Sequence, residues 1–364
     1  MSELKDEIKI SVVICAYNEA RLVGDCLEGL KAQTYPKTHF EAVVIENESK
    51  DSTPEIVRSI IEKGNGDKTM IRMIRKKHGG VSESRNLGIK ESQFDIIAFL
   101  DADAVPDPKW LEKLADEFRA GADYVGGRIN LLNSDSTIAQ IVQLTRHVQV
   151  FGPEVYSEHL IGCNMAFRRS IFDEHGGFYE NFTSRGDESN LSARMMGGSY
   201  LYRGAPEAIV LHERSQSVSD NLRIEWKAGL VAELGRAVNR DNTSLREWCL
   251  IAEQLIIVLV IPSFFLWLIG LQWALLPLGM GALSSFRRLF GKKLARIVFR
   301  GLRKQYGWVM GFVLSYIYMY VMATIRLFTG VIGRFLYRNA TGVLPMTTRP
   351  IVLEDISTFE KESK

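Results

Sequence analysis

The sequence has few cysteines, and their spacing excludes the common metal-binding patterns. Four occur in 364 residues, and no two stand close enough to resemble a zinc-binding pair. They are Cys15, Cys26, Cys163 and Cys249. Three lie within apolar patterns, where a buried thiol behaves as a small hydrophobic side chain. We therefore expect a reducing, cytosolic compartment for this part of the chain. The opening residues, MSELKDEIKI, contain no apolar run, so no cleaved signal peptide is expected to export them.

Internal repeats and low-complexity tracts are absent, and a formal net charge of +2 is too small to indicate a partner. The charge is nevertheless uneven. The segment FRRLFGKKLARIVFRGLRKQY, residues 286–306, carries many basic residues and no acid, interleaved with apolar residues at roughly helical spacing. Apolar stretches flank it on both sides, which favours an amphipathic helix on anionic membrane lipids over nucleic-acid binding. We expect no nucleic-acid partner.

Long apolar runs are confined to the region after residue 249. Residues 249–284 and 307–332 carry few charges over lengths that meet the roughly 20 residues a membrane span requires. The basic segment between them should stay cytosolic, so the first run should enter and leave on one side. It is too short to cross a core of about 30 Å twice as a helix. We predict a bent hairpin at 249–284, one full span at 307–332 and a polar tail at 335–364. A full pass by residues 249–270 is the alternative.

Residues 1–245 are predicted to form an α/β domain, followed by the membrane region at 246–334. Short β-branched runs alternate with helical patterns in IKISVVICA, ARLVGDCLEGLKAQ, EAVVIE, STPEIVRSIIEKG, TMIRMIR, SESRNLGIKES and DIIAFL. Strands separated by helices of this length indicate βαβ units, hence a doubly wound, mostly parallel sheet. DPKWLEKLADEFR and ADYVGGRINLL predict a further helix and strand. LRIEWKAGLVAELGRAVNR predicts an amphipathic helix that leads towards the membrane.

Two acids end a fully apolar strand in IIAFLDADAVPDPKWL, residues 96–111. The run Ile96–Leu100 is typical of a strand buried on both faces, and the end of such a strand commonly carries the chemistry of an open α/β sheet. Asp101 and Asp103 follow in a turn, where both carboxylates can reach a divalent cation. Mg²⁺ or Mn²⁺ held in this way takes its other ligands from phosphate oxygens and water, which points to a nucleoside diphosphate. A solvated turn rich in Asp is the alternative.

Several motifs follow one another in the order and spacing of the family 2 glycosyltransferases. They are SVVICAYNEA, VVIENESKDST, GGVSESRNLGI, FLDADAVPDPKWL, GCNMAFRRSIFDEHGGF, RGDESNLSARM and PEAIVLHERS. The chain resembles this family from about residue 8 to about residue 235. The resemblance implies the GT-A fold and transfer of a sugar from a nucleoside-diphosphate sugar.

The resemblance also implies which residues contact the donor. The implied donor-binding residues are Ala16, Tyr17, Asn18, Glu19, Glu46, Ser84, Arg85 and Asn86, together with Asp101 of the metal motif. Glu46 stands where the family usually has Asp, so the identity of the base is not indicated. Glu46 and Glu48 are alternatively exposed loop acids, and Arg85 is alternatively a structural partner for an acid at the sheet edge.

For metal and acceptor chemistry, the resemblance implies that Asp101, Asp103 and His212 hold Mn²⁺ or Mg²⁺, with Asp103 as the direct ligand. A structural role for His212 is equally compatible with its place after a strand. Inversion needs a base for the acceptor's proton. The motif places Glu188 there, with Asp187 as the reserve. The order of acids departs from the family, and helix N-terminal acids favoured by the macrodipole are the alternative. Asn164 is expected to line the acceptor or sugar side.

These features predict an inverting, metal-dependent glycosyltransferase at the cell membrane, with its front half in the cytosol. The membrane region favours a lipid-linked acceptor of the polyprenyl or dolichyl phosphate type. A glycan polymerase or synthase of the same family is the nearest alternative, but Gln-x-x-Arg-Trp is absent. A sugar nucleotidyltransferase would need a glycine-rich basic loop in place of CAYNEARLVG. A non-catalytic membrane scaffold is the remaining alternative, and the sequence does not indicate an oligomeric state.

Overall fold

The computed structural model describes residues 7–63, 70–136, 139, 160–180, 186–195 and 198–238, with isolated positions between 303 and 332. These residues divide into two compact units: one contains the sheet and its covering helices, and the other contains α8, Val218–Val238. The predicted hairpin and the polar tail lie outside the described residues, as do nearly all of the basic segment and the span at 307–332. Among the described residues, no helix is long and apolar enough to cross a membrane.

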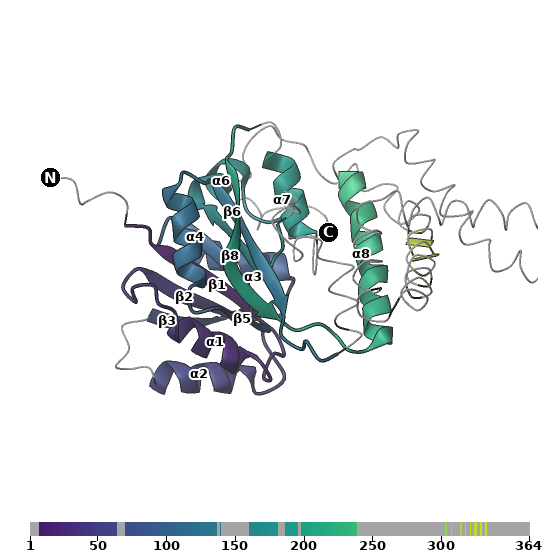
Figure 1. Ribbon diagram of the computed structural model, residues 1–364, viewed down its shortest axis with the longest axis horizontal. Coiled ribbons are helices and arrows are strands. Elements are labelled where there is room, and N and C mark those ends of the chain that lie inside the picture. Colours follow the sequence, from purple (N-terminus) through teal and green to yellow (C-terminus); the bar gives the residue numbers. More distant parts are fainter. Residues whose placement is uncertain are drawn as a thin grey trace, which may run out of the picture. The chain divides into compact units, whose positions relative to one another are not determined.

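The first unit is built on an eight-stranded sheet with the order β3-β2-β1-β4-β7-β6-β8-β5 (Figure 1). The strands are β1 Ile10–Ala16, β2 Phe40–Glu46, β3 Met70–Arg75, β4 Ile96–Asp101, β5 Ala104–Pro106, β6 Tyr124–Leu131, β7 Asn164–Arg168 and β8 Tyr202–His212. β3, β2, β1 and β4 are parallel, as the alternating pattern predicts.

The sheet is mostly parallel, as predicted, because β6 and β8 run in the same direction as β4, but two strands in its other half are reversed. β7 runs antiparallel to both β4 and β6, and β5 runs antiparallel to β8. Apolar periodicity reports that a strand is buried but not which way it runs. The sequence pattern therefore could not distinguish the buried strand β7 from a parallel one.

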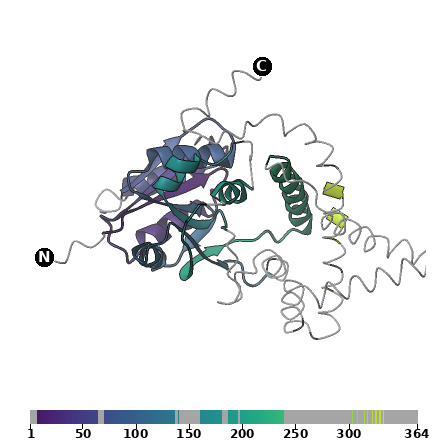
Figure 2. The ribbon, with the colours of Figure 1, turned by 90° about the horizontal axis from the view of Figure 1, so that it is seen from above.

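Helices cover both faces of the sheet, which confirms the doubly wound arrangement (Figures 1 and 2). One face carries α1 Val23–Lys31, α2 Thr53–Lys63 and α4 Trp110–Arg119. The other carries α3 Val81–Glu91, α6 Arg169–His175 and α7 Asp187–Met195. Each helix predicted between residues 20 and 119 is confirmed, as is the helix predicted before the membrane region, which is α8.

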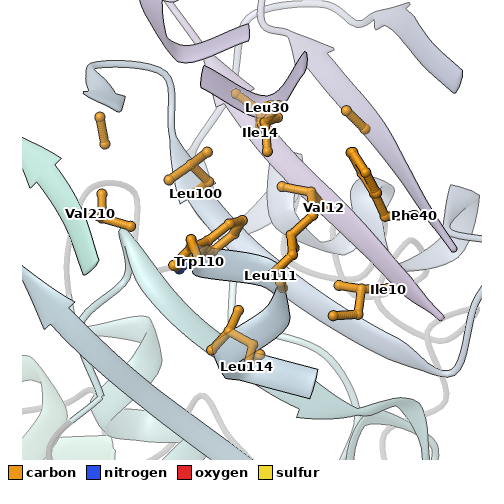
Figure 3. Packing of buried hydrophobic residues seen from close by; sticks show 14 of the residues in the cluster. Ile10, Val12, Ile14, Leu30, Phe40, Leu100, Trp110, Leu111, Leu114 and Val210 are labelled. Atoms are coloured by element: carbon orange, nitrogen blue, oxygen red, sulfur yellow. The ribbon is translucent and has the colours of Figure 1, made fainter. Parts of the chain in front are cut away.

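The sheet is apolar on both faces because each face packs against a separate cluster of side chains. In β1, Val12 belongs to the cluster under α1 and α4, whereas Val13 belongs to the cluster under α3 and α6. Figure 3 shows Trp110 and Leu111 of α4 beside Val12 of β1 and near Leu100 of β4. This double burial explains why the run Ile96–Leu100 contains no polar residue.

The strand directions bring several strand ends to one edge of the sheet. β1, β2 and β4 are parallel and end there. Two antiparallel steps, from β4 to β7 and from β7 to β6, restore the original direction, and β8 is parallel to β6. The carboxyl ends of β4 and β8 therefore lie at the same edge, and the first residue of β7 lies there too.

Candidate active site

The turn after β4 brings the two predicted metal acids against a histidine. Asp101 ends β4, and β5 follows the turn and pairs with β8 so that Ala104 lies opposite His212. Nε2 of His212 lies 3.3 Å from Oδ1 of Asp103 and 3.7 Å from Oδ2 of Asp101. Its Nδ1 lies 2.5 Å from the carbonyl oxygen of Glu213, which can only accept a hydrogen bond. Nδ1 therefore faces this carbonyl, and Nε2 is the ring nitrogen that faces the two carboxylates, where an ion would lie.

Two further side chains border this cluster. Sγ of Cys163, a carboxylate oxygen of Asp101 and a ring nitrogen of His212 all lie within 4.8 Å of one another. Burial, reinforced by the charges of Asp103 and Asp101, raises the pKa of the half-buried Glu19 to about 7. The convergence of three carboxylates favours a cation at this edge of the sheet. Sequence reasoning missed Cys163, whose only signal was its position directly before the strand that pairs with β4.

Arg85 of α3 connects the acid turn to the start of α7. Its Nη2 lies 3.7 Å from Oδ1 of Asp101, and its Nη1 lies 2.5 Å from Oδ2 of Asp187. Both Arg85 and Asp187 are buried. A Cβ on Gly162 would lie 2.2 Å from Nη2 of Arg85, so this glycine leaves the space that the guanidinium fills. The geometry therefore agrees with the interpretation of Arg85 as a structural partner for acids at the sheet edge.

Asp187 and Glu188 open α7, and their environments separate their protonation. Burial acts to raise the pKa of Asp187, but the Arg85 guanidinium outweighs it and lowers that pKa. Burial raises the pKa of Glu188 to about 8, and the hydrogen bond with Asp187 and the charge of Asp187 add to the rise. Asp187 is wholly buried, whereas Glu188 is partly exposed. Of the two acids, Glu188 is the one that an acceptor can reach.

The loop after β1 is held against the loop after β2. Asn18 has a φ of 56°; its backbone N–H donates to Oγ of Ser49 at 3.0 Å and its Oδ1 accepts from the N–H of Lys50 at 2.9 Å. The rings of Tyr17 and His78 lie with their centroids 4.2 Å apart. His78 is exposed and Tyr17 is partly exposed, so these rings offer a surface on which a flat base can stack. Sequence reasoning missed His78, which directly precedes the glycine pair of HGG.

Glu46 is not an exposed loop acid. Its side chain is buried, its Oε1 accepts from the backbone N–H of Ser49 at 2.6 Å, and its Oε2 lies 3.0 Å from Nε of Arg75. Glu48, in contrast, is exposed, and its Oε2 accepts from the N–H of His78 at 3.0 Å. The buried carbonyl of Ala16 accepts from the N–H of Asn47 at 3.0 Å, which ties the two loops together.

Three polar residues that were expected to contact substrate are buried in the interior: Ser84, Asn86 and Asn164. The hydroxyl of Ser84 donates to the carbonyl of Gly80 at 3.3 Å. The amide of Asn86 donates to the carbonyl of Phe178 at 2.8 Å and accepts from its N–H at 2.7 Å.

Asn164 is 1% exposed, and its Oδ1 accepts from Nε1 of Trp110 at 2.8 Å. Its Nδ2 donates to the carbonyls of Arg128 and Ala208, each at 2.9 Å. These partners satisfy the side-chain amide. The structure therefore gives Asn164 a role in joining β7 to its neighbours, and it corrects the expectation that Asn164 lines the acceptor side.

This chain is similar in sequence to known glycosyltransferases. A family model described as Glycosyl transferase family 2 matches residues 11–176. Glycosyltransferase AglE of Haloferax volcanii is 31% identical over 224 residues, which make up 60% of this chain and 71% of that protein. The glucosyl-dolichyl phosphate glucuronosyltransferase of the same organism is 28% identical over 201 residues, which make up 50% of this chain and 59% of that protein.

Among solved structures, mannosyltransferase PcManGT from Pyrobaculum calidifontis, in complex with GDP-Man and Mn²⁺, has a TM-score of 0.56 to this chain. It is 16% identical, and the match covers 91% of this chain and 88% of that one. At this identity the likeness shows the fold, a mixed α/β sheet that resembles the GT-A glycosyltransferases. The matched family model and the relative AglE show that this chain belongs to glycosyltransferase family 2 and is a glycosyltransferase.

Proposed function

We propose that this glycosyltransferase moves a sugar, with inversion, from a nucleoside-diphosphate sugar to a lipid-linked acceptor at the membrane, with the help of Mn²⁺ or Mg²⁺. The observation that carries the proposal is the convergence at one sheet edge of an ion-binding cluster and a reachable carboxylate. His212 lies within 3.7 Å of the carboxylates of Asp101 and Asp103. Arg85 links Asp101 to the start of α7, where Glu188 lies.

The residues present fit a divalent ion. Two carboxylates and an imidazole whose Nε2 faces them form a donor set that suits Mn²⁺ and accepts Mg²⁺ less well. Asp103 and His212 would hold the ion, and Asp101 would join them directly or through water. When bound, the ion would neutralise charge on the leaving nucleoside diphosphate. The solved mannosyltransferase with this fold is in complex with GDP-Man and Mn²⁺, which supports this assignment.

Glu188 is the proposed base. It accepts the acceptor's hydroxyl or phosphate proton on Oε while the acceptor oxygen attacks the sugar carbon from the face opposite the diphosphate. Arg85 lowers the pKa of Asp187, so Asp187 stays ionised, and its hydrogen bond and negative charge add to the effect of burial in raising the pKa of Glu188. A buried, paired Asp187 thus tunes its neighbour and holds the start of α7 in place.

The donor's base is proposed to stack on the Tyr17 and His78 rings. Glu46 is buried and paired with Arg75, so it does not contact a base in this arrangement. Its carboxylate instead stabilises the loop after β2 by accepting a hydrogen bond from the N–H of Ser49. Exposed polar groups of the loop after β2, such as the carboxylate of Glu48, are better placed to form hydrogen bonds with the edge of the nucleotide base.

The proposed acceptor and location rest on the sequence after residue 245 and on a relative. The apolar and basic segments favour a membrane-bound rear with the catalytic unit in the cytosol. A relative that is 28% identical is named for transfer to glucosyl-dolichyl phosphate, which supports a lipid-linked acceptor of that chemical class.

Incubation of the full-length chain in lipid vesicles with a panel of nucleoside-diphosphate sugars, Mn²⁺ and polyprenyl phosphate tests the proposal. We expect a lipid-linked glycoside with the anomeric configuration opposite to that of the donor. Retained configuration would contradict the inverting mechanism, and transfer only to soluble acceptors would contradict the lipid assignment.

Membrane topology is tested separately with cysteines introduced by Phe290→Cys and Pro350→Cys. In sealed vesicles whose cytosolic face is inside, an impermeant thiol reagent should label position 350 and spare position 290. Labelling of position 290 from outside would favour the alternative single pass.

A further inference from the structure

We propose that the ion cluster is also a site for a thiophilic divalent ion, Zn²⁺ or Cd²⁺, with Cys163 as a ligand. In this state Cys163 joins Asp101 and His212. Such an ion would compete with the Mn²⁺ or Mg²⁺ of the proposed function, and this competition rests on that proposed function. The thiophilic site itself stands on the geometry of the three ligand atoms.

Sheet register explains why the thiol reaches the cluster. In the antiparallel pair of β4 and β7, Leu100 lies opposite Asn164. Asp101 directly follows Leu100, and Cys163 directly precedes Asn164, so these two residues are neighbours at the same edge of the sheet. Sγ of Cys163, a carboxylate oxygen of Asp101 and a ring nitrogen of His212 then lie within 4.8 Å of one another.

The spacing suits a small tetrahedral site. Zinc bonds of about 2.0–2.3 Å place neighbouring ligand atoms roughly 3.5 Å apart. Nε2 of His212 lies 3.7 Å from Oδ2 of Asp101 and 3.3 Å from Oδ1 of Asp103. Asp103 lies outside the group of three ligand atoms within 4.8 Å of one another, so its side chain would have to turn towards Cys163 to complete a set of two oxygens, one nitrogen and one sulfur.

Hydrophobic packing alone does not explain why a cysteine is buried at position 163. Cys163 is 2% exposed, yet among the described residues it belongs to neither of the two hydrophobic clusters of the core. Cys26, which is also buried, does belong to one of them. The polar neighbours of Cys163 distinguish it from an ordinary core cysteine.

The ligand chemistry separates the two kinds of ion. A thiolate ligand favours Zn²⁺ and Cd²⁺, whereas Mg²⁺ and Mn²⁺ disfavour sulfur ligands. Binding of the thiophilic ion forms the metal–sulfur bond and releases the thiol proton to solvent. Four protein ligands would close the coordination shell, leaving no position for diphosphate oxygens. The thiophilic ion would therefore inhibit donor binding.

The test titrates the full-length chain with Cd²⁺ alone and follows the ultraviolet charge-transfer absorption of a cadmium–thiolate bond. We expect a saturable band in the natural protein and in the control Cys15→Ala, whose cysteine lies opposite Asp101 on β1 but outside the cluster. Cys163→Ala should lose the band. Its Zn²⁺ affinity should fall by at least about tenfold, because loss of even an outer partner of a metal ligand costs 10–100-fold.

A second measurement needs no variant. Electron paramagnetic resonance should show Mn²⁺ released from the natural protein when Zn²⁺ or Cd²⁺ is added. A band that persists in Cys163→Ala or Cys163→Ser, or a natural protein without a band, would overturn the proposal. Mn²⁺-dependent binding of a nucleoside-diphosphate sugar, measured on the same preparations, reports separately on the proposed function. Donor binding without a cadmium band would reject the thiophilic site alone, and a band without donor binding would reject the proposed function alone.

Discussion

Arg85 of α3 and Asp187 of α7 form a buried ion pair, with Nη1 and Oδ2 2.5 Å apart, although 102 positions separate them in the chain. The same guanidinium lies 3.7 Å from Asp101 at the end of β4. One cation therefore joins the ion cluster to the helix that carries Glu188. Arg85 is thus a direct link between the proposed ion site and the helix of the proposed base.

Loss of the Arg85 side chain should destabilise the protein. Arg85→Ala leaves the carboxylate of Asp187 buried without its cation, which typically costs about 3–5 kcal/mol in the free energy of unfolding. Arg58→Ala is the control, because Arg58 pairs with Glu55 on the exposed face of α2 and should cost about 1 kcal/mol or less. Urea unfolding of both variants measures the difference. Equal losses would show that the buried pair contributes nothing special.

The space beside Arg85 gives a second prediction. Gly162→Ala would place a Cβ 2.2 Å from Nη2 of Arg85, so the guanidinium must leave the position in which it contacts Asp101 and Asp187. We expect transfer to fall at least tenfold, since small displacements in a catalytic arrangement are costly. In Gly24→Ala the added Cβ meets Ile56 at an ordinary 3.6 Å, so activity should be kept. Steady-state transfer assays compare the two, and an active Gly162→Ala would contradict the positioning role of Arg85.

Glu188→Gln keeps the shape of the side chain but removes its ability to accept a proton. Turnover should fall by about 10²–10⁴-fold while donor binding stays near that of the natural protein. Glu55→Gln is a matched control, because Glu55 also lies in the first turn of its helix. If both variants retain full turnover, Glu188 serves only the helix macrodipole. If Asp187→Asn is the crippling change instead, the base is Asp187.

The raised pKa of Glu188 predicts how activity depends on pH. A base acts in its deprotonated form, which is the minority below a pKa of about 8. The ratio kcat/KM should therefore rise about tenfold per pH unit below that value and level off above it. Asp187→Asn removes both the hydrogen bond and the charge through which Asp187 raises this pKa, so the rising limb should move to lower pH. A profile that is flat from pH about 6 to 9 would contradict the assignment.

Much of the first half of the fold could be predicted from the sequence, because β-branched runs and helical patterns alternate along it. The run that ends at Asp101 also predicted the place of the candidate site, since ligands of open α/β sheets commonly bind at the carboxyl ends of the strands. The direction of β7 could not be predicted, because a strand buried on both faces has the same apolar pattern whichever way it runs.

The hydrogen-bond and ion-pair partners of polar side chains could not be predicted from the sequence either. Asn164 stands in a motif associated with substrate, yet its amide bonds Trp110 and two backbone carbonyls. Arg85 and Cys163 gain their neighbours from strands and helices far along the chain. Spacing between cysteines excluded a zinc motif, but it carries no information about ligands contributed by three separate elements.

The cluster at the ends of β4 and β8 is proposed to hold the ion that binds the donor's diphosphate. Calorimetric titration of nucleoside diphosphates into the full chain, with and without Mn²⁺, measures this binding in the natural protein and in Asp103→Ala. We predict binding that requires Mn²⁺ in the natural protein and is lost in Asp103→Ala, with unfolding by urea unchanged within about 1 kcal/mol. Mn²⁺-dependent binding of equal affinity in the variant would contradict the account.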